Sequence, residues 1–180
     1  MALTKLTALL GIVPNSARHG ERLIAAAGGF LAILAAIRIT GYYLPSGSGA
    51  PLIVASMGAS SVLLFIVPGS PFSQPWPLLA GHLIPAAIGV SCAMLIPDLP
   101  VASAVTVSAT ILAMHYLRCI HPPGCATALT AVIGGGDIHA LGYQFLITPV
   151  GINVLVMLGM AILVNYWFPG RRYPAVLNAK

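Results

Sequence analysis

The stretch with the clearest capacity for chemistry covers residues 118–136, which read RCIHPPGCATALTAVIGGG. It combines an arginine, a histidine and a Pro-Pro pair with small residues and three closing glycines, and the sequence on both sides is apolar. Backbone that is broken at membrane depth must be buried in protein or face water. The composition therefore predicts that this stretch lines a site.

Two arginines, Arg38 and Arg118, lie inside or at the ends of apolar segments. A charge at the centre of a bilayer costs about 3 kcal/mol on insertion scales and usually marks a pair or a pathway. The chain has only three acidic residues, at a membrane edge or in turns: Glu21, Asp98 and Asp137. Buried arginines without acidic partners predict an anion site, whereas arginines that extend to the lipid headgroups are the alternative.

Small residues follow each arginine and would complete such a site. Gly58 and Gly124 would let the backbone approach a ligand, and a helix N-terminus offers an anion its N–H groups and the positive end of its dipole. Ser60, Ser61 and Thr127 add hydroxyl donors. These residues predict a site for a small inorganic anion, and close helix packing is the alternative explanation of the same composition.

Two histidines lie in apolar surroundings. The unperturbed pKa of histidine is about 6.5, so His121 could carry a proton or gate the site. A structural histidine, bonded to a carbonyl that Pro122 and Pro123 leave free, is the other interpretation. His82 has the same two interpretations, and the structural one is favoured.

Four soft ligands suggest a second function, since sulfur and imidazole suit Cu(I) or Zn(II). They are His115, Cys119, His121 and Cys125. The Pro-Pro pair breaks the helix between them, and a buried free cysteine usually acts as a small apolar residue. A copper or zinc permease is therefore the second hypothesis, and an accessory membrane protein without a substrate is the third. No carboxylate pair, Gly-x-Ser-x-Gly elbow or P-loop is present, so we expect neither an enzyme nor a cofactor.

The composition is that of an integral membrane protein. Hydrophobic residues make up 58% of the 180 residues and charged residues 6%, against about 25% charged in soluble domains. No basic stripe with interleaved aromatics is present, which excludes a nucleic-acid partner. Basic residues cluster toward both ends of the chain, at Lys5, Arg18, Arg22, Arg171, Arg172 and Lys180. By the positive-inside rule both termini are expected in the cytoplasm.

Six apolar segments predict an all-α membrane fold in a single domain, residues 1–180. A tail (1–20) precedes two repeats of three segments each, 22–97 and 98–168, and a second tail (169–180) follows. The middle segments of the repeats, 51–68 and 121–136, are predicted to be short broken or re-entrant helices. Repeats of three crossings would have inverted orientations, as in many transporters. If the middle segments only enter the membrane and return, each repeat crosses twice and the two repeats are parallel.

Several blocks resemble the HPP family of integral membrane proteins. His121-Pro-Pro-Gly124, followed by Ala126-Thr-Ala-Leu129 and Gly134-Gly135, is similar to the family signature, and Ser56-Met-Gly-Ala-Ser60 and Pro149-Val-Gly-Ile-Asn153 are similar to further blocks. Chloroplast and cyanobacterial members are linked to nitrite transport. The resemblance implies nitrite or a similar anion as the substrate. We expect a bacterial plasma-membrane protein, and the small bundle favours a homodimer.

Overall fold

The computed structural model describes residues 9–12, 17–44 and 50–178. This part of the chain is helical throughout, without strands, which confirms the predicted all-α class. The α-helices are α2 (His19–Tyr43), α3 (Ala50–Ile66), α4 (Pro75–Leu95), α5 (Leu99–Tyr116), α6 (Pro122–Ile133), α7 (Gly136–Leu141) and α8 (Ile152–Asn165). Shorter helical turns are η1 (Pro71–Ser73), η2 (Leu146–Gly151) and η3 (Ala175–Asn178). Most of the predicted N-terminal tail lies outside the described residues.

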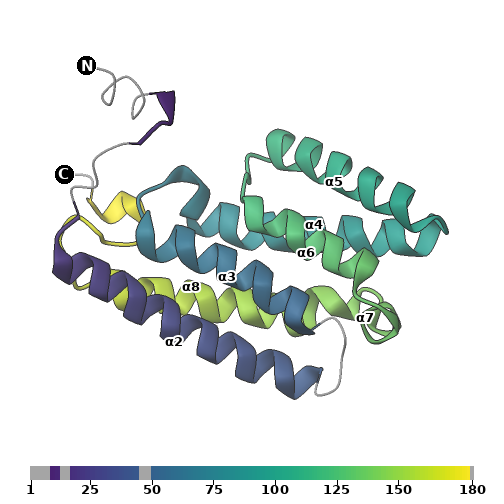
Figure 1. Cartoon of the computed structure of the whole chain (residues 1–180), viewed down its shortest axis with the longest axis horizontal. Helices are drawn as coiled ribbons and strands as arrows, with labels where there is room; N and C mark the ends of the chain where they lie inside the picture. The colour runs from purple at the N-terminus through teal and green to yellow at the C-terminus, as the bar shows by residue number, and fades with distance from the viewer. Residues whose placement is uncertain (1–8, 13–16, 45–49, 179–180) are drawn as a thin grey trace.

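Within the described residues, four helical segments are long and apolar enough to cross a membrane: α2, α4, α5 and the run Leu146–Asn165, which joins η2 to α8 across a kink at Thr148. The chain reverses at each connection, so that α2, α4 and α6 run opposite to α3, α5 and α8 (Figure 1). We call α2, α3 and α4 the first unit and α5, α6 and α8 the second, because the second set repeats the order of the first with the inverted orientation. The beginning of α2 and the end of α8 lie at the same end of the bundle.

The two segments predicted to be short form α3 and α6, which are the shorter apolar helices beside the four candidate spans. Helix α3 has 17 residues and α6 has 12, which correspond to about 25 Å and about 18 Å of helix. Helix α6 alone is too short for a hydrocarbon core of about 30 Å. The last predicted segment is also broken, because Pro149 lies in η2 and a proline has no N–H to continue a helix.

Hydrogen bonds near Asp98 and Arg118 mark where α5 begins and ends. Asp98 caps α5, its carboxylate accepting from the N–H of Val101 at 2.9 Å. After α5, the N–H of Arg118 donates to the carbonyl of His115 and the N–H of Cys119 to that of Met114. This pair of bonds closes the helix with Arg118 at φ +54°, a left-handed position that usually holds glycine.

Helices α4 and α6 cross at very close range. A Cβ on Gly124 would lie 1.5 Å from the carbonyl oxygen of Gly81, and one on Gly89 would lie 2.2 Å from that of Ala128. Pro85 lies inside α4 and cannot donate to the carbonyl four residues earlier, that of Gly81. Gly124 thus serves the contact between two helices, and this contact determines the depth at which α6 begins.

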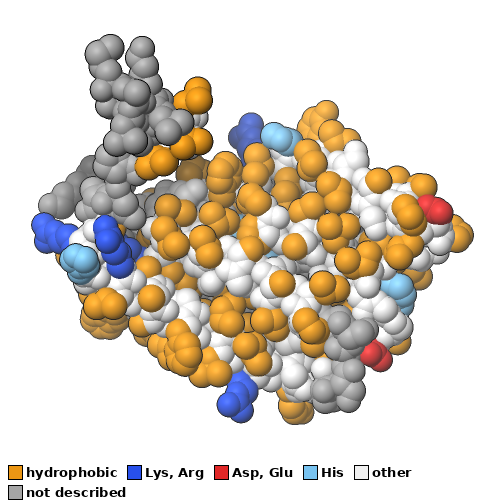
Figure 2. Space-filling model, in the orientation of Figure 1, with side chains coloured by type: hydrophobic (Ala, Val, Ile, Leu, Met, Phe, Trp, Pro, Cys, Tyr) orange, Lys and Arg blue, Asp and Glu red, His pale blue; other side chains and the backbone are white. Residues whose placement is uncertain are grey.

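Hydrophobic side chains cover most of the visible surface, and the few charged groups lie at its margins (Figure 2). Arg38 and Arg118 are both exposed, so the expectation that these arginines are buried was wrong. The physical reason is the length of the arginine side chain, which carries its guanidinium away from apolar surroundings when the backbone lies near a helix end.

Candidate functional site

Five polar side chains meet in the interior of the bundle, and we call them the histidine–serine cluster. They are Ser56 and Ser60 from α3, His82 from α4, His121 immediately before α6, and Thr127 from α6. Each is 0% exposed. Residues four apart share a helix face, so Ser56 and Ser60 both point toward α4 and α6.

Ser60 is the centre of the cluster. Its Oγ lies 2.8 Å from His82 Nε2 and 2.9 Å from His121 Nε2. The two imidazole rings are tilted by 60° with their centroids 4.9 Å apart. One hydroxyl thus bridges two histidines that lie on different helical segments.

The hydrogen bonds continue outward on both sides of Ser60. His121 Nδ1 lies 2.8 Å from the carbonyl oxygen of Phe72. His82 Nδ1 lies 2.8 Å from Thr127 Oγ1, which in turn lies 3.0 Å from Ser56 Oγ. Ser56 Oγ lies 2.8 Å from the carbonyl oxygen of Ile53. Each cluster residue is therefore bonded, as burial of a polar group requires.

The close crossing of α4 and α6 brings the two histidines together. A Cβ on Gly81 would lie 2.5 Å from the Cβ of His121, so only glycine lets the loop before α6 approach α4 beside His82. Pro122 and Pro123 start α6 immediately after His121. His121 thereby lies beside Gly81 in the first half of α4, and its Nδ1 reaches the carbonyl of Phe72, which precedes that helix.

The structure unites some of the predicted site residues and separates others. Ser60, His121 and Thr127 meet in the cluster. Ser61 faces elsewhere, with its hydroxyl bonded to the carbonyl of Gly58 at 2.7 Å, and a Cβ on Gly58 would meet open space. Arg38 and Arg118 contribute no hydrogen bond to the cluster.

The start of α6 offers an anion fewer donors than a typical helix N-terminus. Its first two residues are prolines, which have no N–H. The N–H of Gly124 already donates to the carbonyl of His121 at 2.9 Å. The polar groups next to this helix start are therefore the imidazoles and hydroxyls of the cluster.

Sequence reasoning gave His82 a structural role and did not single out Ser56. Two features of the sequence could have indicated these residues. Ser56 and Ser60 are four residues apart, and His82 lies inside a largely apolar helix. Only the packing of α3 against α4 and α6 shows that these side chains share one network. Phe72 contributes a backbone carbonyl, which the type of residue does not reveal.

The soft ligands proposed for copper or zinc do not assemble. His115 is exposed, Cys119 is buried and Cys125 is half-buried. Within the described residues, no three histidine, cysteine or acidic side chains are grouped closely enough to hold a metal ion.

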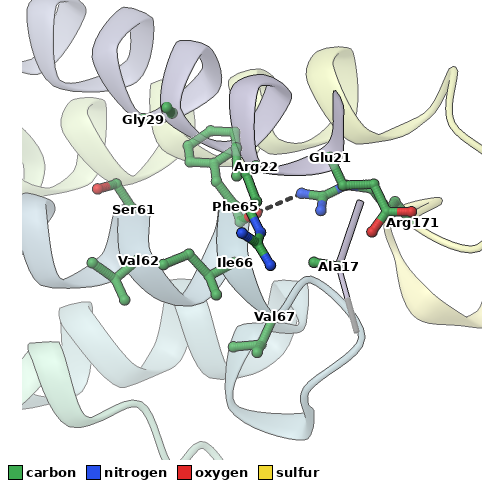
Figure 3. A pocket seen from close by; sticks show the side chains of 12 residues that line it. Ala17, Glu21, Arg22, Gly29, Ser61, Val62, Phe65, Ile66, Val67 and Arg171 are labelled. Atoms are coloured by element: carbon green, nitrogen blue, oxygen red, sulfur yellow. Dashed lines mark hydrogen bonds between the residues drawn. The ribbon is translucent and has the colours of Figure 1, made fainter. Parts of the chain in front are cut away.

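A cavity of about 670 Å³ lies between α2 and α3 (Figure 3). Apolar side chains such as Val62, Phe65 and Ile66 line it, with Arg22 and Arg171 among its polar groups. Burial lowers the pKa of Arg171, and the negative charge of Glu21 partly offsets this. The cavity contains Ser61 but none of the five cluster residues, so we do not assign the site to it.

Comparisons with known proteins agree with this architecture. A family model described as HPP, transmembrane region, matches residues 14–174. A transmembrane protein of Dictyostelium discoideum is 37% identical over 126 residues, which are 68% of this chain and 40% of the relative. A second Dictyostelium transmembrane protein is 36% identical over 127 residues, 68% of this chain and 44% of the relative. The chain thus spans less than half the length of these relatives, and no solved structure matches it significantly.

Proposed function

The chain belongs to the HPP family of membrane proteins, and from this premise we propose that it transports a small monovalent anion, foremost nitrite, across the membrane. The observation that carries the proposal is the histidine–serine cluster. Five polar side chains that are 0% exposed, two of them histidines, meet in one hydrogen-bonded network in the interior of the bundle. Polar groups at membrane depth usually mark the pathway of a substrate or an ion.

The chemistry of the cluster suits an anion that carries oxygen atoms. Hydroxyls and imidazole N–H groups donate hydrogen bonds to such oxygens. The short helix α6 starts beside the cluster, and its dipole directs positive potential to the same place. A broken helix at the interface of two inverted units is the arrangement in which many transporters hold their substrates. In this proposal Ser60, His121 and Thr127 contact the anion, together with His82.

The test is nitrite flux into vesicles reconstituted with the purified protein, compared with protein-free vesicles at mildly alkaline pH. We expect saturable uptake that nitrate and formate inhibit to different degrees. Uptake equal to that of protein-free vesicles, in a sample shown to be folded, would remove nitrite as the substrate. The same vesicles with copper or zinc would then test the metal hypothesis.

The placement of charge supports an orientation for this transporter. Arg18, Arg22, Arg171 and Arg172 lie with Glu21 at the end of the bundle where α2 begins and α8 ends, and Arg38 and Asp98 lie toward the opposite end. The positive-inside rule then puts both termini in the cytoplasm. We place the protein, as a homodimer, in the plasma membrane of a bacterium.

In this orientation Arg118 lies at the cytoplasmic end of α5, three residues before His121. We propose that it attracts anions to the cytoplasmic mouth. A non-glycine residue in the left-handed region costs roughly 1 kcal/mol, and the retention of arginine there supports a use for its side chain.

Arg118→Gly is therefore expected to raise stability by up to about 1 kcal/mol and to slow uptake. The slowing should appear only when nitrite is added on the side of the termini, and it should disappear at high salt, which screens exposed charges. Arg118→Lys keeps the charge and should retain the rate. Equal rates for the glycine and lysine variants at low salt would exclude this role, and slowing from the opposite side would reverse the orientation.

A further inference from the structure

We infer that the histidine–serine cluster binds one proton together with each anion, so that anion and proton cross the membrane as an electrically neutral pair. This inference rests on the proposed function of the same site. It is carried by the charges available around the cluster and by the directions that its hydrogen bonds can take.

The helices around the cluster supply no fixed charge. Helices α3, α4, α5, α6 and α8 contain no aspartate, glutamate, lysine or arginine. Their ionisable groups, and those of the loop before α6, are the two cluster histidines, the exposed His115, Tyr116 and Arg118, and three cysteines, Cys92, Cys119 and Cys125. Helix α2 carries Glu21, Arg22 and Arg38, and none of them hydrogen bonds to the cluster. A positive charge inside the cluster can therefore come only from a proton on an imidazole.

The neutral cluster has one arrangement of hydrogens that satisfies every imidazole nitrogen. The carbonyl of Phe72 can only accept, so His121 Nδ1 donates to it and His121 Nε2 must accept. The single hydroxyl hydrogen of Ser60 can also reach the carbonyl of Ser56 at 3.2 Å; in the neutral arrangement it goes to His121 Nε2, and His82 Nε2 therefore donates to Ser60. His82 Nδ1 then accepts from the Thr127 hydroxyl, which is turned away from Ser56 in this arrangement.

The same contacts also accept one extra proton. When a proton binds to His82 Nδ1, that nitrogen donates to Thr127, and the Thr127 hydroxyl turns to donate to Ser56. The Ser56 hydroxyl already donates to the carbonyl of Ile53, 2.8 Å away, so the Ser56 oxygen can accept from Thr127. Rotation of the Thr127 hydroxyl thus accommodates the charge without loss of a hydrogen bond to either histidine.

The extra proton can reside on either histidine. If His121 carries it, His121 Nε2 donates to Ser60 and Ser60 donates to His82 Nε2. Transfer of the His121 proton to the Ser60 oxygen, with simultaneous transfer of the Ser60 proton to His82, moves the charge across the bridge and leaves Ser60 neutral. A second proton would place two positive charges on rings whose centroids are 4.9 Å apart, without a counter-charge.

The proton explains how a site without fixed charge holds an anion. In the neutral cluster the donors bridge one another, and no net charge attracts a ligand. In the protonated cluster an anion beside the imidazolium would neutralise the buried charge, which is costly when unpaired. The two ions then stabilise each other and leave together.

The first test measures protons and nitrite simultaneously in vesicles that contain a pH-sensitive dye. Vesicles with the Ser60→Ala variant correct for nitrous acid that crosses the lipid unaided. We expect one proton to enter with each nitrite, and a potassium diffusion potential should leave the rate unchanged. Nitrite entry that follows the membrane potential without protons would overturn the inference and leave the transport function intact.

A second test does not depend on transport. The variant His19→Gln, His115→Gln, His139→Gln retains only the two cluster histidines, and glutamine at 139 keeps a donor for the carbonyl of Val132. We expect nitrogen NMR of the labelled protein to show one proton bound by the pair, affecting the signals of both rings. Two rings that stay neutral, or that each bind a proton independently, would overturn the inference even if nitrite is not transported.

Discussion

Gly124→Ala is expected to abolish stable folding. The new Cβ would lie 1.5 Å from the carbonyl oxygen of Gly81, and a backbone atom inside a helix cannot rotate away as a side chain can. Helices α4 and α6 would have to separate along their crossing. Overpacking of this kind costs about 3 kcal/mol at the upper end of its usual range, which is a large part of the stability of most domains. The measurement is the recovery and thermal midpoint of the monodisperse protein in detergent.

Gly159→Ala is the matched control for this variant. Gly159 lies inside α8, and a Cβ there would meet no atom within 4 Å. Alanine is the better helix former by about 1 kcal/mol, so this variant should equal or exceed the wild type in stability. A Gly124→Ala protein with the thermal midpoint of the wild type would show that the glycine contact does not hold α4 against α6.

Ser60→Ala is expected to have the largest effect on transport among substitutions that still fold. It removes the hydroxyl that bridges His82 Nε2 and His121 Nε2. Two buried nitrogens then lose a partner, at a cost of about 1–3 kcal/mol each, and the proton can no longer pass between the rings. We expect nitrite flux to fall by at least about tenfold, which corresponds to 1.4 kcal/mol. The assay is initial uptake normalised to folded protein.

Ser61→Ala provides the control on the neighbouring residue. The Ser61 hydroxyl donates to the carbonyl of Gly58 in its own helix, outside the cluster. Its loss should change flux by less than about twofold, because such local bonds contribute little. Equal flux losses in the two serine variants would indicate a general disturbance of α3 and would contradict the assigned role of Ser60.

Two histidine variants separate binding from a purely structural role. His121→Asn places an amide near the former Nδ1 position and retains a donor to the carbonyl of Phe72, but it loses the acceptor for Ser60. His82→Gln places an amide near the former Nε2 position and retains a donor to Ser60. If the cluster only supported the fold, these substitutions would largely preserve flux. If it carries the proton, both should remove proton entry while the protein remains folded.

The composition and the local sequence determined much of this protein. Scarcity of charge identifies a membrane protein without reference to its fold, because a surface facing water needs charged groups. Pro122 and Pro123 place the start of a helix by their lack of N–H groups, and Asp98 places another by capping it. The order of the segments and the motif after His121 also predicted a short α6 and the family. These properties depend on a residue and its near neighbours along the chain.

The tertiary structure alone decided which polar residues meet. His82 and Ser56 joined the site, and Arg38 and Arg118 remained at the surface, although the sequence made the arginines the more prominent candidates. A contact between α3, α4 and the start of α6 depends on how closely those helices can approach and at what height they cross. The fit of Gly81 against Gly124, residues 43 positions apart, sets that approach, and no local pattern in the chain encodes it.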